Sequence, residues 1–392
     1  PGVQDHSHQW FDTNPRAAEM LTTLRLMNGS LQGRDIEEGM LKSMLSRIGE
    51  DGLYYNAPYR EDAPWRDGGY GGRIKFDASE DVSGMWGNAQ FLIALIDRYQ
   101  LTQDPQTLAA ARGLAEGLMR IAIRKDDYAY YPATVEFGFD FAWQKKSGWP
   151  DTREAVDETD APEGTVACTI AVVARALSQW YALTGDSKAL ETARLLVNYI
   201  LFPRFWLGNM EGWGEDVKHV WASHGGLPVK PAAIFKGHFS GVAYTFQGLM
   251  DYAYIANDPY VTEFVRQGYE YMRNFGLKTI GMYGENIANS IMAAVAIRLT
   301  EAGAGDYFED VDQHIRNTMV EDQIINRDLL IKLCKEKGVP TEQGRYSVDS
   351  LLGSLRHDGI FSKNLFFDPT ALNPVASPYM EPFYYVWESI VR

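Results

Sequence analysis

Three acidic residues stand at the start of apolar helical segments. Asp81, Glu163 and Glu285 each lie 21 or 23 residues before the acid that closes the following segment. This spacing predicts that the three carboxyl groups reach a similar height around one cavity. Glycoside hydrolysis needs such a pair, one group protonated and one ionised, and burial raises the pKa of one of them. The alternative is structural, since an acid in a first helical turn also interacts favourably with the helix dipole.

Two histidines offer a different chemistry at the same position. His238, in KGHFSG, starts a helical segment where the acids stand elsewhere, and His224 belongs to the link before it. Such histidines, or one of them with a tyrosine such as Tyr283, can act as general acid and base. Sugar epimerisation and polysaccharide elimination therefore stay open beside hydrolysis.

Aromatic residues gather in the links between helical segments. Seven of the ten tryptophans lie in or beside them, among acids and amides that suit sugar rings and their hydroxyl groups. The expected substrate contacts are His238, His224, Trp86, Tyr283, Asn88, Trp221 and Arg73. Arg73 could pair a uronate carboxylate. The alternatives are that the tryptophans hold the links onto the scaffold or bury in a homodimer interface.

Other site classes lack their sequence signals. No HxH, HExxH or His/Cys cluster is present, so no metal site is expected. There is no P-loop and no GxGxxG after a strand, so no nucleotide cofactor is expected. Cys168 and Cys334 give no CxxC and no disulfide framework.

A helix-pair repeat positions these residues. The segments 91–107, 172–189, 244–260 and 291–307 each contain an apolar helix, a short turn and an acid that can cap the next helix. Those acids are Asp104, Asp186, Asp258 and Asp306. Weaker pairs follow the same pattern at 15–29 with 35–49, and among 327–337, 346–356 and 381–391.

The two helices of a pair differ in pattern. The first is apolar on all sides, whereas the second carries a stripe that includes Leu114, Leu118 and Ile121. Apolar helices belong inside and striped ones outside. The sequence therefore predicts an all-α, (α/α)6 toroid of close to twelve helices. Links within a pair are short and most links between pairs are long, so the long ones should share the face where the inner helices begin.

Composition also argues against some classes of protein function. The chain has 392 residues and a net charge of −15, which argues against a nucleic-acid binder. No apolar run is long enough to cross a bilayer, so no membrane insertion is expected. We expect one catalytic domain over residues 1–392, with 1–14 as an extended segment. The chain starts at Pro1, as a processed protein would. A periplasmic, secreted or cytoplasmic location all stay open.

The segment 284–323, with the LTGD and ANDP turns, resembles the six-hairpin glycosidases. It is similar to families 127 and 154, the β-L-arabinofuranosidases and β-glucuronidase-like enzymes. Arg316, Asn317 and Glu321 match an outer-helix Arg-Asn-x-x-x-Glu stretch of that group. The resemblance covers about residues 80–325 and implies a toroid in which a glutamate begins a barrel helix.

One departure from family 127 limits that resemblance. Asn286 and Ile287 follow Glu285 where a cysteine would be expected, and no cysteine cluster exists. The cysteine-nucleophile chemistry of that family is therefore not carried over. The prediction is an exo-acting glycoside hydrolase on oligosaccharides, uronate-bearing ones included, with Glu285 and Glu163 as the pair and Asp81 third. An epimerase or lyase on the same toroid and a non-catalytic sugar-binding protein are the alternatives.

Overall fold

The structure is a computed structural model. It describes residues 14–55, 81–132, 142–149, 165–202, 206, 239–277, 279–283, 286–321, 323, 325–337, 341–343, 346–353 and 377–391.

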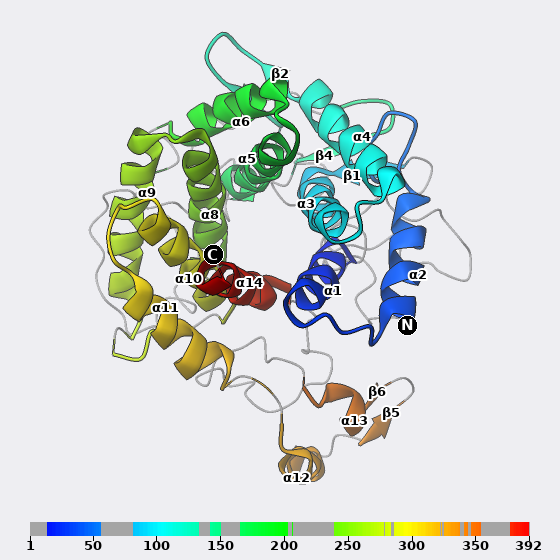
Figure 1. The fold of residues 1–392 in the computed structure, drawn as a ribbon, viewed down its shortest axis with the longest axis vertical. Coiled ribbons are helices and arrows are strands. Elements are labelled where there is room, and N and C mark those ends of the chain that lie inside the picture. Colours follow the sequence, from blue (N-terminus) through cyan, green and yellow to red (C-terminus); the bar gives the residue numbers. More distant parts are fainter. Residues whose placement is uncertain are drawn as a thin grey trace.

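Six helices of the described residues form a closed inner ring (Figure 1). In chain order they are α1 (Asn14–Asn28), α3 (Met85–Thr102), α5 (Thr165–Thr184), α8 (Phe239–Ala256), α10 (Asn286–Glu301) and α14 (Ser377–Val391). Each packs on the next, and α14 packs on both α10 and α1. The predicted (α/α)6 toroid is confirmed, and the C-terminal helix completes its inner ring.

The described outer layer is made by the second helices of the first five pairs. It comprises α2 (Arg34–Leu45), α4 (Pro105–Ile121), α6 (Ser187–Ile200), α9 (Pro259–Met272) and α11 (Phe308–His314), the last continued by a π-helical turn (Ile315–Met319). Leu114 and Leu118 of α4 are buried while Arg112 and Glu116 on its other side are exposed. The stripe therefore faces the inner ring, as its spacing predicts.

The caps of the outer helices are largely as predicted. Asp104, Asp186 and Asp258 are the N-caps of α4, α6 and α9, and their carboxylates accept backbone N–H groups of the first turn, two each for Asp104 and Asp258 and one for Asp186. Asp306 differs. Its carboxylate accepts the Phe308 N–H at 3.3 Å, but α11 begins one residue later, with Tyr307 at the cap position.

Close contacts between the layers and within the ring depend on glycine. A Cβ added at Gly248 of α8 would lie 2.3 Å from the Ala171 carbonyl oxygen of α5, so the two backbones touch. A Cβ at Gly268 of α9 would meet the ring of Phe246 at 2.1 Å. These two glycines set the spacing between α5, α8 and α9.

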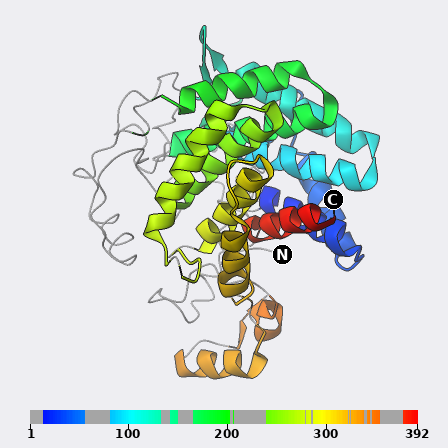
Figure 2. The same cartoon turned by 60° about the vertical axis from the view of Figure 1, so that its left-hand side comes forward.

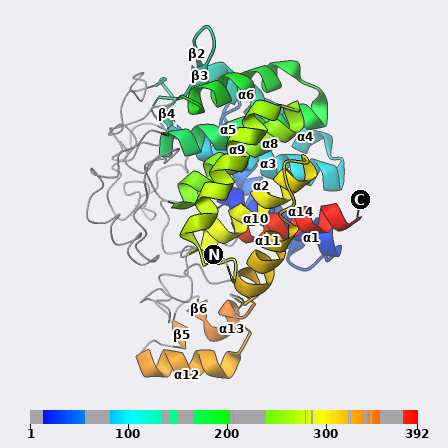
Figure 3. The same ribbon diagram turned by 90° about the vertical axis from the view of Figure 1, so that its left-hand side faces the viewer.

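Short two-stranded sheets and a small satellite complete the described residues. β1 (Val82–Gly84) pairs with β4 (Trp143–Lys145), β2 (Ile123–Arg124) with β3 (Ala129–Tyr130), and β5 (Glu342–Gln343) with β6 (Tyr346–Ser347), all antiparallel. The helix expected at 346–356 is wrong, because β6 begins there and α13 spans only Val348–Leu351. With α12 (Arg327–Lys337) it forms a separate small core, apart from the ring (Figures 2 and 3).

The two ends of the ring differ in what they carry. α3, α5, α8 and α10 begin at one end, which we call the entry end, and the short links within pairs lie at the other, the short-link end (Figure 3). Among the described residues, no helix is both long enough and apolar enough to span a membrane.

Candidate active site

Only part of the predicted site lies within the described residues. Asp81, Trp86, Asn88 and Tyr283 are described. The others lie outside the described residues: Arg73, Glu163, Trp221, His224, His238 and Glu285.

Asp81 lies at the entry end but not at a helix start. Its carbonyl oxygen accepts the Lys146 N–H at 2.9 Å, which extends the β1–β4 pairing by one step. The strand β1 then separates Asp81 from α3, whose N-cap is Gly84. By chain position, the residue that corresponds to Glu285 before α10 is therefore Gly84 rather than Asp81.

Asn88 is fully buried, and its side chain joins α3 to two other segments of the chain through hydrogen bonds. Its Oδ1 accepts the Tyr54 N–H at 2.7 Å, while its Nδ2 donates to Ser83 Oγ at 2.8 Å and to the Gly84 carbonyl at 2.7 Å. Asn289 does the same in α10, where its Oδ1 accepts the Tyr283 N–H at 2.6 Å. In both places an asparagine in the second turn of an inner helix fixes an extended segment against that helix.

Tyr283 is also buried, between an inner and an outer helix. Its ring lies 5.0 Å from Phe239 and stacks on His314 at 5.5 Å. The His314 ring also contacts the Gly281 carbonyl oxygen through Nδ1. Burial lowers the pKa of His314 to about 4, so this imidazole is neutral at pH 7.

Trp86 belongs to a cluster at the entry end that joins three inner helices. Its ring meets Tyr244 of α8 edge to face at 4.9 Å. The guanidinium of Arg16 from α1 lies 5.4 Å from the Trp86 ring and 5.3 Å from the Tyr244 ring. Trp86 is 5% exposed, and its Nε1 donates to no group of the described residues. A guanidinium held against two aromatic rings is stabilised by cation–π attraction to each of them.

Further polar groups along the same stripes lack partners. Gln90 follows Trp86 by one turn of α3, and Gln247 follows Tyr244 on α8. Gln90 Oε1, both amide atoms of Gln247, and Thr169 Oγ1 of α5 make no hydrogen bond within the described residues, although all three side chains are buried. Buried polar atoms of this kind call for water or a ligand. We call Trp86, Gln90, Thr169 and Gln247 the axial polar layer.

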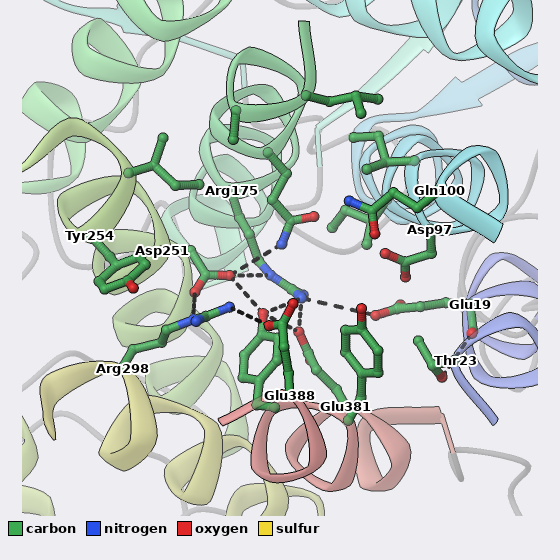
Figure 4. A pocket seen from close by; sticks show the side chains of 18 residues that line it. Glu19, Thr23, Asp97, Gln100, Arg175, Asp251, Tyr254, Arg298, Glu381 and Glu388 are labelled. Carbon is green, nitrogen blue, oxygen red and sulfur yellow. Dashed lines mark hydrogen bonds and ion pairs between the residues drawn. The ribbon is translucent and has the colours of Figure 1, made fainter. Parts of the chain in front are cut away.

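Deeper along the axis, ionisable side chains from every inner helix line a cavity of about 370 Å³ (Figure 4). The charged residues are Glu19, Asp97, Arg175, Asp251, Arg298, Glu381 and Glu388. Arg175, 2% exposed, holds the centre. Its Nε lies 2.8 Å from Asp251 Oδ2, and its Nη2 contacts Glu381.

Two of these acids have raised pKa values. Burial raises the pKa of Glu19, although the charge of Arg175 opposes it. Burial, and then the charge of Glu19, raises the pKa of Asp97 well above its ordinary value. Sequence reasoning missed this cluster. The available signal was a charge inside an otherwise apolar pattern, as in LIDRY, VVARAL, LMDYAY and AIRLT.

No group of His, Cys, Asp and Glu side chains that fits a metal ion occurs among the described residues. Cys168 and Cys334 are both buried free thiols.

Comparison with known proteins identifies the architecture. No protein-family model matches the chain, and no curated protein matches it by sequence. Similar solved structures include a cellobiose 2-epimerase from Spirochaeta thermophila, with a TM-score of 0.54 at 11% identity, over 97% of this chain and 86% of that one.

Two family 76 glycoside hydrolases from Bacteroides thetaiotaomicron are also similar. An α-mannanase gives a TM-score of 0.53 at 12% identity over 98% of this chain and 87% of that one. A mannosidase gives 0.51 at 12% identity over 98% and 88%. At these identities the likeness establishes the fold, so the resemblance to families 127 and 154 stays a prediction. The chain is an (α/α)6 toroid of the kind found in glycosidases and sugar epimerases.

Proposed function

We propose that this protein is a carbohydrate-active enzyme, an exo-acting glycoside hydrolase that receives an oligosaccharide at the entry end of the toroid. The observation that carries the proposal is the axial polar layer. An indole N–H, one whole amide, the oxygen of a second amide and a hydroxyl lie buried on the N-terminal halves of α3, α5 and α8, without hydrogen-bond partners among the described residues. A sugar presents hydroxyl groups that both donate and accept, and so matches such a mixed set.

The catalytic pair in this proposal is Glu285 and Glu163, with Asp81 as the third acid. Glu285 immediately precedes α10, and Glu163 lies two residues before α5. Helix N-termini favour the ionised form of one carboxyl group, whereas burial in a sugar-filled site favours the protonated form of the other. That division of roles is what glycoside hydrolysis needs.

Arg16 favours an acidic sugar. Its guanidinium is buried at the entry end, against Trp86 and Tyr244. With Arg73 in the link before α3, it adds positive charge near the entry end, and this charge favours a uronate-bearing substrate.

Epimerisation is the second candidate. Cellobiose 2-epimerases and a sugar epimerase are among the similar structures, alongside the glycoside hydrolases. His224 and His238 would then be the acid and the base, and Tyr283 is buried beside Phe239, the first residue of α8 and the one that follows His238.

The test is mass spectrometry of products from a panel of neutral and uronate-bearing oligosaccharides. Glu285→Gln and Glu163→Gln are compared with Glu116→Gln, a matched change on the exposed side of α4. Hydrolysis by the wild type and by Glu116→Gln, lost in both site variants, is the expected result. Isomerisation without change of mass, lost in His224→Asn and His238→Asn, would replace hydrolysis by epimerisation. A glycan that stabilises the protein but is recovered unaltered would contradict both and leave a sugar-binding protein.

A further inference from the structure

The cavity at the short-link end is separate from the proposed sugar site. It lies among the C-terminal halves of α3, α5, α8 and α10, whereas the axial polar layer runs from the first turn of α3 to the middle of α8 and contributes none of the lining residues. Its rim includes Gln100, Ala182 and Tyr254, which are exposed, so the cavity opens to solvent at the short-link end. About 370 Å³ is within the range of small-molecule sites.

The charges around this cavity do not balance. Five carboxyl groups line it, against the two guanidinium groups of Arg175 and Arg298. Arg298 is already shared, because it pairs Glu301 at 2.6 Å and lies 4.1 Å from the ring of Tyr385. Burial raises the pKa of Asp97, and a cation bound beside this carboxyl group in the low-dielectric cavity would favour its ionised form.

Two carboxyl groups around the cavity are incompletely satisfied, and Asp97 is the one without an ion pair to the residues that the structure describes. Asp251 is 3% exposed, and its Oδ1 accepts no hydrogen bond within the described residues, since the nearest cationic atom, Arg298 Nε, is 3.7 Å away. Asp97 makes no ion pair or hydrogen bond with the described side chains, and no dashed line reaches it in Figure 4. Both therefore have acceptor capacity left over in the cavity.

Three tyrosines of the cavity indicate which kind of cation it would bind. Tyr254, Tyr384 and Tyr385 line the same cavity. Arg298 already lies 5.0 Å from the Tyr254 ring and 4.1 Å from the Tyr385 ring, so these rings do accept a cation. Aromatic faces next to carboxylates suit an organic ammonium group, which binds through N–H donation and through cation–π attraction. The absence of any His, Cys, Asp and Glu group of metal-binding geometry among the described residues gives a metal ion no comparable support.

We propose that this cavity is a second binding site, for a small organic molecule that carries a primary ammonium group. The ammonium binds at Asp97, on the α3 side of the cavity, where Arg175 separates it from Asp251 (Figure 4). This inference does not depend on the sugar chemistry at the entry end.

The test is calorimetric titration with 1,4-diaminobutane, and with 1,4-butanediol as its neutral counterpart. The amine is expected to bind and the diol is not. Asp97→Asn should weaken amine binding at least about tenfold, because a charge-assisted hydrogen bond is lost. Ala182→Arg, a change on the exposed rim that adds a positive charge, should weaken it as well, whereas Ala182→Gln should not. Asp126→Asn, on an exposed loop, is the matched control for loss of one negative charge.

Proton release gives an independent readout of the site. Asp97 faces Glu19 of α1, Arg175 of α5 and Glu388 of α14, with Asp251 of α8 and Arg298 of α10 around the same cavity. A bound ammonium favours ionised Asp97, so binding should release protons, measured as a difference in heat between two buffers of unlike ionisation enthalpy. Equal behaviour of amine and diol, or unchanged amine binding in both Asp97→Asn and Ala182→Arg, would overturn the proposal. The sugar assays above are unaffected by that outcome.

Discussion

Arg175 should be the most costly single side chain to remove from the ring. It is 2% exposed, and besides Asp251 and Glu381 it contacts the Tyr385 hydroxyl at 3.3 Å and lies 3.9 Å from Glu19. Arg175→Met keeps the length and most of the volume of the side chain, so the cavity contribution is small. What remains is a set of buried carboxylates without their main counter-charge.

The expected loss follows from that geometry. Removing one partner of a buried ion pair costs about 3–5 kcal/mol of the free energy of unfolding. Arg298 keeps part of the compensation, because its Nε remains 3.7 Å from Asp251 Oδ1, so we expect the lower half of that range at pH 7. The loss should shrink at pH 5, since protonation of the abandoned carboxyl groups removes the uncompensated charge.

Urea unfolding, followed by circular dichroism, measures this difference. The matched control is Arg194→Met, which breaks a 2.7 Å pair with Glu191 on the exposed side of α6. Exposed pairs of this kind contribute about 0.5 kcal/mol or less. A loss in Arg175→Met within about 1 kcal/mol of the control, or one that grows on acidification, would refute the argument that Arg175 neutralises the axis.

Three further predictions use the same unfolding assay. Gly248→Ala should cost about 1–3 kcal/mol because its Cβ meets the backbone of α5, whereas Gly39→Ala, on an open face of α2, should stabilise by about 0.5–1 kcal/mol. His314, with its pKa lowered from 6.5 to about 4, gives stability that is complete above pH 6.5 and is lost as the pH falls toward 4, so His314→Gln should flatten that part of the pH profile. Asp97, with its pKa raised, favours the folded state below pH 3.8 and loses that contribution as the pH rises, so Asp97→Asn should stabilise the protein at pH 7 but not near pH 3.8. A uniform effect of Asp97→Asn across this pH range would contradict the last of these.

Local signals were enough to predict the helical layers. The spacing of Leu114 and Leu118 marks a buried stripe, and Asp104 and Asp258, each followed by proline, mark the start of an outer helix. These features act over a few residues, so they are readable without knowing what lies across the fold. The (α/α)6 architecture follows from repeating them.

The site was less accessible to the same reasoning, for a physical reason. Asn88 is a plausible sugar contact in sequence, but its amide is used up by Tyr54, Ser83 and Gly84, which lie up to 34 residues away in the chain. Asp81 has the right spacing to a cap acid, yet β1 intervenes before the helix. Such pairings depend on how an incoming segment meets the ring, which periodicity does not encode.

The axial charges are the clearest case of information that exists only in three dimensions. Asp97, Arg175 and Asp251 each interrupt an apolar pattern, and only closure of the ring brings them together with the acids of α1 and α14. Replacing a buried ion network by apolar side chains is often neutral or stabilising, so stability alone does not account for it. Asp97 even lowers stability at neutral pH, because its raised pKa means that its ionised form opposes folding there. If Asp97→Asn gains stability and loses amine binding together, the carboxyl group serves a ligand at the expense of the fold. If it changes neither, the axis is a packing solution for a ring too wide to fill with apolar side chains.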